Sequence, residues 1–141
     1  MNTPAMGARG FATLQALLAE APCQLRIHGT CMNPTIRHHQ TVTVARARCY
    51  WPGDVLVVRA HDGRLYAHRL ILVYRRHGRW RYVTRADTAA RADTALERER
   101  ILGRLMEPVG WRGRLLGWWG VGGLLGNYLH RKIRSRNTQI Q

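Results

Sequence analysis

The chain almost entirely lacks lysine. Lys132 is the only one, so all but one of the 23 basic residues are arginine. This single lysine lies in a basic stretch near the end of the sequence, far from any segment with a catalytic pattern. A mechanism in which a lysine activates a nucleophile in the body of the chain is therefore excluded.

Acidic residues are also scarce. Eight aspartates and glutamates against 23 basic residues give a formal net charge of +15 at pH 7. Such an excess creates a positive field that attracts nucleic acid, anionic lipid or acidic peptide, but it does not determine the fold. The sequence has no zinc-finger spacing, recognition-helix pattern or RNP-like aromatic motif. Nucleic acid is therefore the less favoured partner.

Cysteine is too rare, and too irregularly spaced, for a disulfide framework. There are three cysteines and no CxxC pair, so at least one thiol is free of any internal bridge. The region from Cys23 to His39 reads C-x4-H-x2-C-x6-H-H, which matches no common zinc arrangement. We expect no metal and no cofactor. At 141 residues the chain is long enough for one domain with its own hydrophobic core.

No hydrophobic run is long enough to cross a membrane. The N-terminus lacks the basic start, long apolar run and small-residue cleavage site of a secretory signal, which predicts a cytoplasmic chain. The uncharged segment 115–129 would span about 22 Å as a helix, short of the ~30 Å hydrocarbon core. Its tryptophans and flanking arginines fit a segment at a membrane surface. A Gly-rich segment folded back over the sheet is the alternative.

Hydrophobic periodicity predicts a mainly β domain over residues 1–110, followed by an apolar and then basic tail over 111–141. Apolar residues at helical spacing predict one short helix over 10–20. Strands are expected from about 24 to 110, at 24–29, 41–47, 54–60, 64–76, 79–85 and 100–110. The segment 54–60 is almost continuously apolar, which is typical of a buried strand.

Short polar segments separate these strands. Asp62-Gly63 and His77-Gly78 both suit tight hairpins, the Asp-Gly pair more strongly. The stretch 85–95 repeats Arg-Ala-Asp-Thr and is too polar for a core strand, so we expect a surface loop there. The sequence LERER just before the last predicted strand also suits a helical turn.

The segment 28-HGTCMNPTIR-37 places Cys31 in a turn after a predicted strand. Three interpretations are open for this residue: a nucleophile, a metal ligand, or a small hydrophobe, since free cysteine is among the most buried residue types. The local sequence favours none of them, so the decision depends on residues farther along the chain.

Four successive segments, taken together, resemble the signal-peptidase-like family of serine peptidases. They are GTCMNPTI at 29–36, GDVLVV at 53–58, HRLI at 68–71 and TRAD at 84–87, followed by Asp93. In that family a Ser-Met-x-Pro-Thr nucleophile turn precedes a Gly-Asp-hydrophobic strand, a general base on the next strand and an acidic loop. The resemblance covers roughly residues 24–106. It implies the signal-peptidase/LexA-like β-fold, with a Gly/Trp-rich basic segment after it.

The residue at the base position separates the branches of this family. Bacterial signal peptidases and LexA-like repressors carry lysine there, whereas the endoplasmic-reticulum and archaeal types carry histidine before Arg-Val/Ile. Here it is His68 in YAHRLI. The histidine branch also has two aspartates six residues apart, which Asp87 and Asp93 match. The resemblance implies that His68 is general base and acid, that Asp93 orients it, and that Asp87 supports the loop or the site.

The sequence departs from the family pattern at three places. Cys31 stands where relatives have serine, Gly29 replaces a serine that often donates to the oxyanion, and Arg-Ala-Asp replaces Gly-Asp-Asn. A thiol beside an imidazole can form a thiolate-imidazolium pair, which is a good nucleophile. The oxyanion contact would then fall on the Cys31 N–H and the Thr30 hydroxyl. Met32 and Pro34 are expected to shape the turn and contact substrate.

These features predict a peptidase that cleaves a precursor or leader peptide through a Cys-His-Asp site. Its substrate would be an extended peptide that adds to a sheet edge. The expected location is the cytoplasm or the membrane periphery, with an anionic membrane surface as a second partner through the tail. The alternative is a non-catalytic relative that binds peptide, membrane or nucleic acid.

Overall fold

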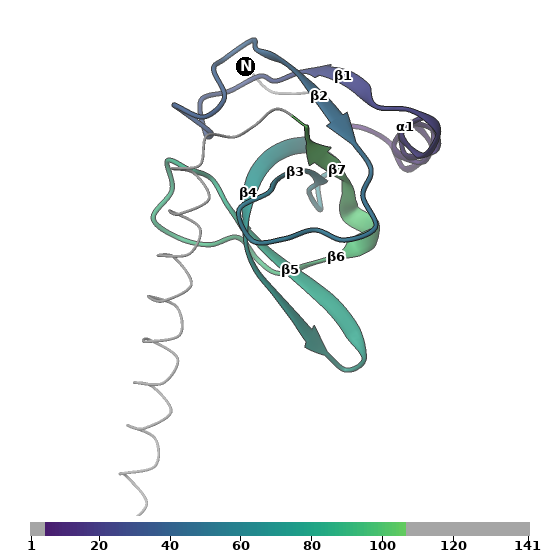
Figure 1. Ribbon diagram of the computed structural model, residues 1–141, viewed down its shortest axis with the longest axis vertical. Helices are drawn as coiled ribbons and strands as arrows, with labels where there is room; N and C mark the ends of the chain where they lie inside the picture. The colour runs from purple at the N-terminus through teal and green to yellow at the C-terminus, as the bar shows by residue number, and fades with distance from the viewer. Residues whose placement is uncertain (1–4, 107–141) are drawn as a thin grey trace, which may run out of the picture.

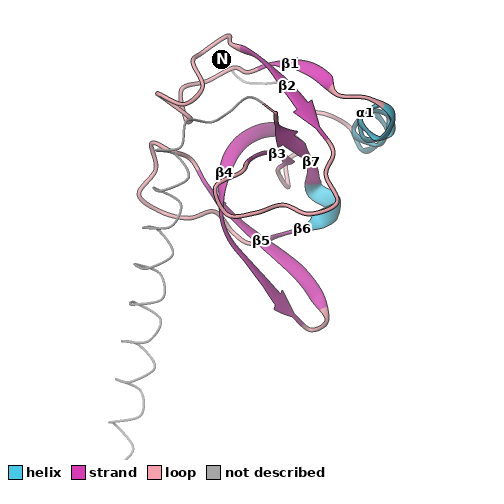
Figure 2. Cartoon of the chain, in the orientation of Figure 1, coloured by secondary structure: helices cyan, strands magenta, loops and turns pink. Residues whose placement is uncertain are grey.

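The computed structural model describes residues 5–106, which form one antiparallel sheet with a short helix beside it (Figure 1). The seven strands lie in the order β1-β2-β7-β3-β4-β5-β6. The elements are α1 (Ala8–Glu20), β1 (Cys23–Arg26), β2 (Thr41–Ala45), β3 (Val55–Arg59), β4 (Leu65–Arg76), β5 (Arg79–Arg85), β6 (Leu96–Glu97), η1 (Arg98–Arg100) and β7 (Ile101–Leu105). The prediction of a mainly β chain with one short helix is confirmed (Figure 2). The predicted tail, 111–141, lies outside the described residues.

Helix α1 covers one end of the sheet and closes a hydrophobic core against it (Figure 1). Its spacing of apolar residues buries Phe11 and Leu18, which pack with residues of β2, β3 and β7. The helix begins at Ala8, earlier than predicted, and ends at Glu20 as predicted, with Pro22 close behind. Among residues 5–106, no helix is long and apolar enough to cross a membrane.

Strand β3 lies in the middle of the sheet and is buried on both faces. Val55 and Val57 point into the core beneath α1, whereas Leu56 and Val58 point into a second core on the opposite face. Successive side chains of a strand alternate between faces, so a strand covered on both sides needs apolar residues at every position. The burial of both faces of β3 explains why the segment 54–60 is almost continuously apolar.

The turn at His77-Gly78 joins β4 to β5 in a tight hairpin. Arg76 pairs with Arg79, which leaves a two-residue loop. Both loop residues have left-handed backbone, with φ of 49° at His77 and 77° at Gly78. A two-residue turn of this kind matches the twist of the flanking strands. The weaker of the two predicted hairpin signals therefore marks the tighter turn.

The Asp62-Gly63 pair forms a wider turn than predicted. The loop 60–64 separates β3 from β4, and the Ala60 N–H donates to the Arg64 carbonyl at 2.8 Å. The Gly63 N–H donates back to Ala60, and the Asp62 carboxylate accepts from the Arg64 N–H. These bonds close the loop around Gly63 (φ +83°) instead of a two-residue turn.

The end of the described chain contains both alternatives that the sequence left open. Within LERER, Leu96–Glu97 form β6 and Arg98–Arg100 form the 3-10 helix η1, and β7 follows η1 directly. β7 lies between β2 and β3 and so completes the sheet. Gly103 on β7 approaches the Ala45 carbonyl so closely that a Cβ would lie 2.6 Å from that oxygen, so only glycine fits there. The last predicted residues, 107–110, lie outside the described part of the chain.

Candidate active site

Cys31 lies in the long turn between β1 and β2. Two backbone hydrogen bonds close this turn, from the Asn33 N–H to the Thr30 carbonyl (3.0 Å) and from the Ile36 N–H to the Met32 carbonyl (2.8 Å). Met32 and Ile36 anchor the turn because both side chains are buried in the core beneath α1. The turn therefore holds Cys31 at the surface of a packed core.

The burial of Met32 corrects one prediction. The side chain was expected to contact substrate, but Met32 is only 1% exposed and packs inside the core. Pro34 is exposed on the turn and does not line the cavity beside Cys31. Met32 thus anchors the turn, and contact of Pro34 with substrate stays a prediction.

The loop 86–95 fastens the Cys31 turn from the other side. Thr88 donates twice to the Cys31 carbonyl, through its N–H (3.2 Å) and through its hydroxyl (3.1 Å). The same loop carries Asp87 and Asp93. Because one loop contacts the cysteine and carries both carboxylates, the relative positions of these three residues are fixed by local bonds.

His68 and Asp93 form a short hydrogen-bonded pair. His68 lies on β4, and its Nδ1 is 2.6 Å from Asp93 Oδ2. The same oxygen accepts a hydrogen bond from the hydroxyl of Thr84 (2.7 Å), and the Asp93 N–H donates to the Thr84 carbonyl (2.8 Å). Thr84 is fully buried on β5. The carboxylate is therefore held from behind and presents one oxygen to the imidazole.

Cys31 is the second partner of the His68 ring. Burial lowers the pKa of His68, but hydrogen bonds and charge interactions with Asp93 and Cys31 outweigh burial and raise that pKa to about 9. Asp93 lies at the Nδ1 atom of this ring. For Asp93, burial acts to raise the pKa, while hydrogen bonds from His68 and Thr84 lower it below its usual value. The imidazolium form is thus favoured at neutral pH.

Asp87 does not contact His68 but belongs to a separate ion pair. Both of its oxygens accept from the Arg69 guanidinium, Oδ1 at 2.8 Å from Nε and Oδ2 at 2.7 Å from Nη2. Thr35 also donates to Asp87 (2.5 Å), and Arg69 donates to the Gly53 carbonyl (3.0 Å). Burial acts to raise the pKa of Asp87, but Arg69 and Thr35 hold it below its usual value. Asp87 therefore joins the Cys31 turn to the sheet, and only Asp93 orients His68.

The predicted oxyanion donors lie at the open side of the turn. The Cys31 N–H donates to no residue of the described chain, and the Thr30 side chain is exposed. Gly29 just before them has φ of +114°, a backbone conformation that disfavours other residues. An unengaged backbone N–H beside the sulfur is what an oxyanion contact requires.

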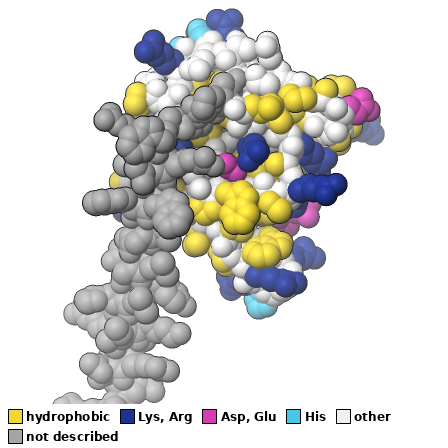
Figure 3. Space-filling model, viewed as in Figure 1, with side chains coloured by type: hydrophobic (Ala, Val, Ile, Leu, Met, Phe, Trp, Pro, Cys, Tyr) yellow, Lys and Arg dark blue, Asp and Glu magenta, His cyan; other side chains and the backbone are white. Residues whose placement is uncertain are grey.

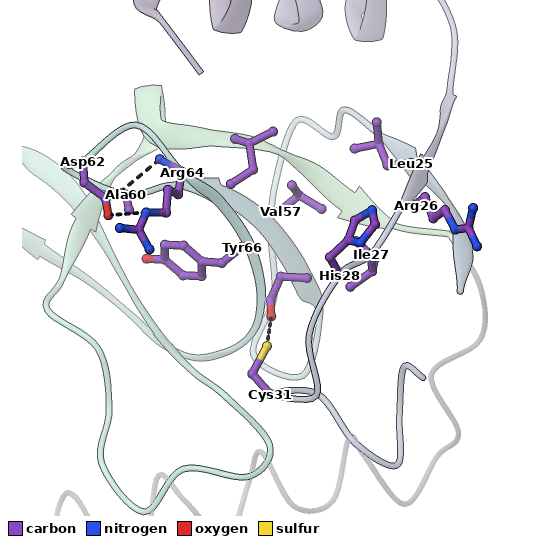
Figure 4. Close-up of a pocket in the computed structure, with 12 residues that line it drawn as sticks. Leu25, Arg26, Ile27, His28, Cys31, Val57, Ala60, Asp62, Arg64 and Tyr66 are labelled. Carbon is purple, nitrogen blue, oxygen red and sulfur yellow. Dashed lines mark hydrogen bonds and ion pairs between the residues drawn. The ribbon is translucent and has the colours of Figure 1, made fainter. Parts of the chain in front are cut away.

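A cavity of about 390 Å³ opens beside Cys31 (Figure 4). Its floor is apolar, and Tyr66, Val57 and Ile27 contribute to it, while His28 and Arg64 lie at its rim. The rings of Tyr66 and His68 contact each other at an interplanar angle of 57°, with centroids 4.5 Å apart. The cavity therefore reaches Cys31, and one of its lining residues, Tyr66, contacts the imidazole of His68.

Two strand edges flank this cavity. β1 is the first strand of the sheet and pairs only with β2, so its other edge has no partner strand among residues 5–106. Residues 65–68 of β4 pair with β3 alone, because the pairing of β4 with β5 begins at Arg69. Leu25 and Ile27 from the first edge and Leu65 and Ala67 from the second line the cavity. An extended segment of another chain would meet unpaired backbone on both sides.

The remaining histidines of the region cluster without forming a metal site. The rings of His28, His38 and His39 lie together, with His38 and His39 only 3.7 Å apart between centroids. His38 Nδ1 accepts a hydrogen bond from the Gly29 N–H (2.8 Å). Within residues 5–106, no group of three or more His, Cys, Asp or Glu side chains is placed to hold a metal ion.

Four residues of the site did not emerge from the sequence as functional. Arg69 forms the ion pair with Asp87, and Thr84 donates a hydrogen bond to Asp93. Thr88 donates to the Cys31 carbonyl, and the Tyr66 ring contacts the His68 ring. Arg69 and Thr84 lie within the matched segments, but the sequence indicated no role for either of them. A signal existed for Tyr66, since it precedes His68 by two positions on a strand and so shares its face.

No family model matches the chain, and no curated protein matches it significantly.

Proposed function

We propose that this chain is a peptidase with a signal-peptidase-like fold, in which Cys31 is the nucleophile, His68 the general base and acid, and Asp93 the residue that orients His68. The observation that carries the proposal is the meeting of these three side chains, which come from three separate segments, with Cys31 lining a cavity. The order of the nucleophile turn, the base strand and the acidic loop along the chain also agrees with the family pattern.

The proposed reaction uses groups already in place. The Cys31 thiolate attacks the scissile carbonyl carbon, and the Cys31 N–H stabilises the resulting oxyanion. The His68 imidazolium gives its proton to the leaving amine, which releases the first product and leaves a thioester on Cys31. His68, now neutral, takes a proton from water as the water attacks the thioester. This releases the carboxylate product and restores the thiolate-imidazolium pair.

The flanking strand edges support an extended peptide as substrate. Backbone groups of an added strand can pair with an unpaired edge, while alternate side chains enter pockets. The apolar floor of the cavity beside Cys31 would take one apolar side chain of the substrate. A precursor or leader peptide that is unfolded around its cleavage site meets this requirement.

Cys31 is the nucleophile that the described residues favour, since residues 5–106 contain no serine. Thr30, next to Cys31, is the proposed second oxyanion donor, and Thr35, Thr84 and Thr88 use their hydroxyls in structural hydrogen bonds.

Site-resolved alkylation tests the proposed nucleophile. The full chain is treated with iodoacetamide near neutral pH, and the rate at each cysteine is followed by mass spectrometry. Cys31 should react faster than Cys49, although Cys49 is the more exposed, because only Cys31 has an imidazolium partner. Cys23 has the same intermediate exposure as Cys31 and is the matched control. Equal rates at all three cysteines would remove the basis of the proposal.

Peptide cleavage tests the activity itself. A diverse peptide mixture is incubated with the wild-type chain, with Cys31→Ala and with Cys31→Ser, and the new termini are identified by mass spectrometry. Cleavage should disappear in Cys31→Ala and persist more slowly in Cys31→Ser, since an imidazole base can also activate a hydroxyl. Products that persist unchanged in Cys31→Ala would assign the cleavage to a contaminant.

A second candidate function is peptide binding without cleavage. The Cys31 sulfur lies 3.9 Å from the Ala67 carbonyl, a contact that a neutral thiol can make as a weak donor. In that state the same cavity and strand edges hold a peptide, and Cys31 is only a small side chain at their end. This function predicts slow alkylation of Cys31 and a peptide affinity that survives Cys31→Ala.

A further inference from the structure

The β4–β5 hairpin projects from the sheet as a two-stranded ribbon (Figure 1). β4 pairs with β3 only over 65–69, and β6 reaches β5 only at Arg81 and Tyr82. Residues 74–80 therefore have no third strand beside them among the described residues. Every residue from 75 to 80 is exposed. An exposed two-stranded ribbon gains little stability from packing, so its sequence is free to serve another purpose.

The end of this ribbon is basic and aromatic. Trp80, a large hydrophobic residue that is 54% exposed, pairs across the ribbon with Arg75, and Arg76 pairs with Arg79 beside them. Arg79 lies 3.7 Å from Glu97, which Arg81 already contacts at 2.8 Å, whereas Arg75 and Arg76 have no acidic partner within residues 5–106. The ribbon thus carries uncompensated positive charge next to an apolar ring.

A second exposed tryptophan follows β2. Trp51 is 65% exposed in the loop 46–54, which also contains Arg46 and Arg48. On the face shown in Figure 3, hydrophobic side chains gather where this loop and the base of the hairpin lie, with basic side chains around them. We call the exposed side chains of the loop 46–54 and of residues 74–81 the aromatic-basic face.

We propose that the aromatic-basic face binds the surface of an anionic membrane. Tryptophan is suited to the headgroup region because its ring is apolar while its N–H stays hydrogen-bonded, and arginines beside it meet lipid phosphates. The proposal is independent of the proposed peptidase activity, because it involves neither Cys31 nor His68. It would place any peptide-binding cavity of the chain close to a membrane.

The alternative partner of a basic ribbon is nucleic acid, which the observations favour less. Proteins that bind nucleic acid typically neutralise 6–10 phosphates along a groove or stripe. Here the exposed arginines form two small groups, at the end of one hairpin and in the loop 46–54, and an exposed tryptophan accompanies each group. Small charged groups with apolar rings fit a flat anionic surface. The uncharged, Trp-containing segment 115–129 gives the sequence a second candidate of the same composition.

Vesicle sedimentation with the full chain tests the proposal. Vesicles of phosphatidylcholine alone are compared with vesicles that also contain phosphatidylglycerol. The hairpin variant carries Arg75→Gln, Arg76→Gln and Arg79→Gln. The matched control carries Arg9→Gln, Arg37→Gln and Arg91→Gln, which removes the same charge from three arginines that are exposed elsewhere. Circular dichroism and urea denaturation confirm that both variants fold as the wild type does.

The hairpin variant should bind phosphatidylglycerol vesicles at least tenfold more weakly than the wild type, and the control at most about threefold more weakly. Trp80→Ala should also weaken binding, while Leu17→Ala, which removes a similarly exposed side chain (52%) from α1, should not. Equal losses of vesicle binding in the two triple variants would show that binding depends on net charge alone, and would overturn the proposal. So would a hairpin variant that binds vesicles normally but has lost affinity for single-stranded RNA.

Discussion

Two neighbouring residues of β4, His68 and Arg69, each pair with one aspartate of the same loop, and the two pairs differ in kind. His68 binds Asp93 beside the cavity, and its second partner is Cys31. Arg69 binds Asp87 with both oxygens, and its side chain is only 4% exposed. One pair contains an imidazole, which can gain or lose a proton, and the other contains a guanidinium, whose charge is permanent. We call His68–Asp93 the chemical pair and Arg69–Asp87 the architectural pair.

The largest effect should come from breaking the architectural pair. Arg69→Met leaves the Asp87 carboxylate partly buried without its partner, and such a change typically costs ~3–5 kcal/mol of stability. Urea denaturation measures this loss. The matched control is Arg64→Met, because the Arg64–Asp62 pair is about half exposed on both sides. An exposed pair contributes under ~1 kcal/mol. Similar losses in both variants would contradict an architectural role for Arg69.

The chemical pair should appear in the pH dependence of stability. The pKa of His68 is raised to about 9 from an ordinary value of 6.5. A raised pKa in the folded state stabilises the protein fully below pH 6.5, and this contribution is lost as the pH rises through 9. The free energy of unfolding should therefore fall over that interval, by up to about 3 kcal/mol. In His68→Gln this fall should be absent.

At acid pH the two pairs should behave alike. The pKa values of Asp87 and Asp93 are both lowered from their ordinary 3.8. Their stabilising contribution is present above that value and is lost as the pH falls below it. His68→Gln should therefore keep the acid loss that Asp87 causes. A variant with unchanged behaviour at both ends of the pH range would show that His68 contributes nothing to stability through its charge.

The alkylation rate of Cys31 should depend on the chemical pair. An unassisted thiol is only a few per cent ionised at pH 7, so the loss of the imidazolium should lower the alkylation rate of Cys31 by roughly ten- to a hundredfold in His68→Gln. The rate at Cys49 in the same molecule is the internal control. If Cys31 keeps its rate in His68→Gln, the imidazole does not activate it, and peptide binding becomes the better account of the cavity.

Most of the fold follows from sequence periodicity, and the exceptions have a physical cause. The period of the apolar residues predicts α1 and the doubly buried β3, because both patterns depend on local spacing. Both dipeptides lie in hairpin turns, but the turn at Asp62-Gly63 is wider than predicted because the width of a turn depends on bonds to its neighbours. Asp62-Gly63 is closed by the backbone and side chains of loop 60–64, which no dipeptide signal contains.

The site was less accessible to sequence reasoning than the fold. The resemblance assigns Asp93 to His68 and leaves Asp87 with support of the loop or the site, but it does not name Arg69 as the partner that Asp87 has in the structure. Which aspartate reaches the histidine depends on the path of the loop between them and on Thr84, whose hydroxyl holds Asp93 in place. Met32 was misplaced for a similar reason, since a turn residue can point inward or outward with the same sequence pattern.

The most selective test compares the two aspartates by their effect on His68. Asp93→Asn removes the negative charge beside the imidazole, and an opposite charge at this distance typically shifts a pKa by 1–3 units. The pKa of His68, followed by NMR, should fall by at least about one unit. Asp87→Asn should leave it nearly unchanged, because Asp87 is not among the partners of His68 and faces Arg69 instead. Both asparagine variants keep a side-chain acceptor, so a general loosening of the loop would move the two titrations equally. A fall of the His68 pKa in Asp93→Asn alone would therefore locate the chemistry of this loop in one carboxylate.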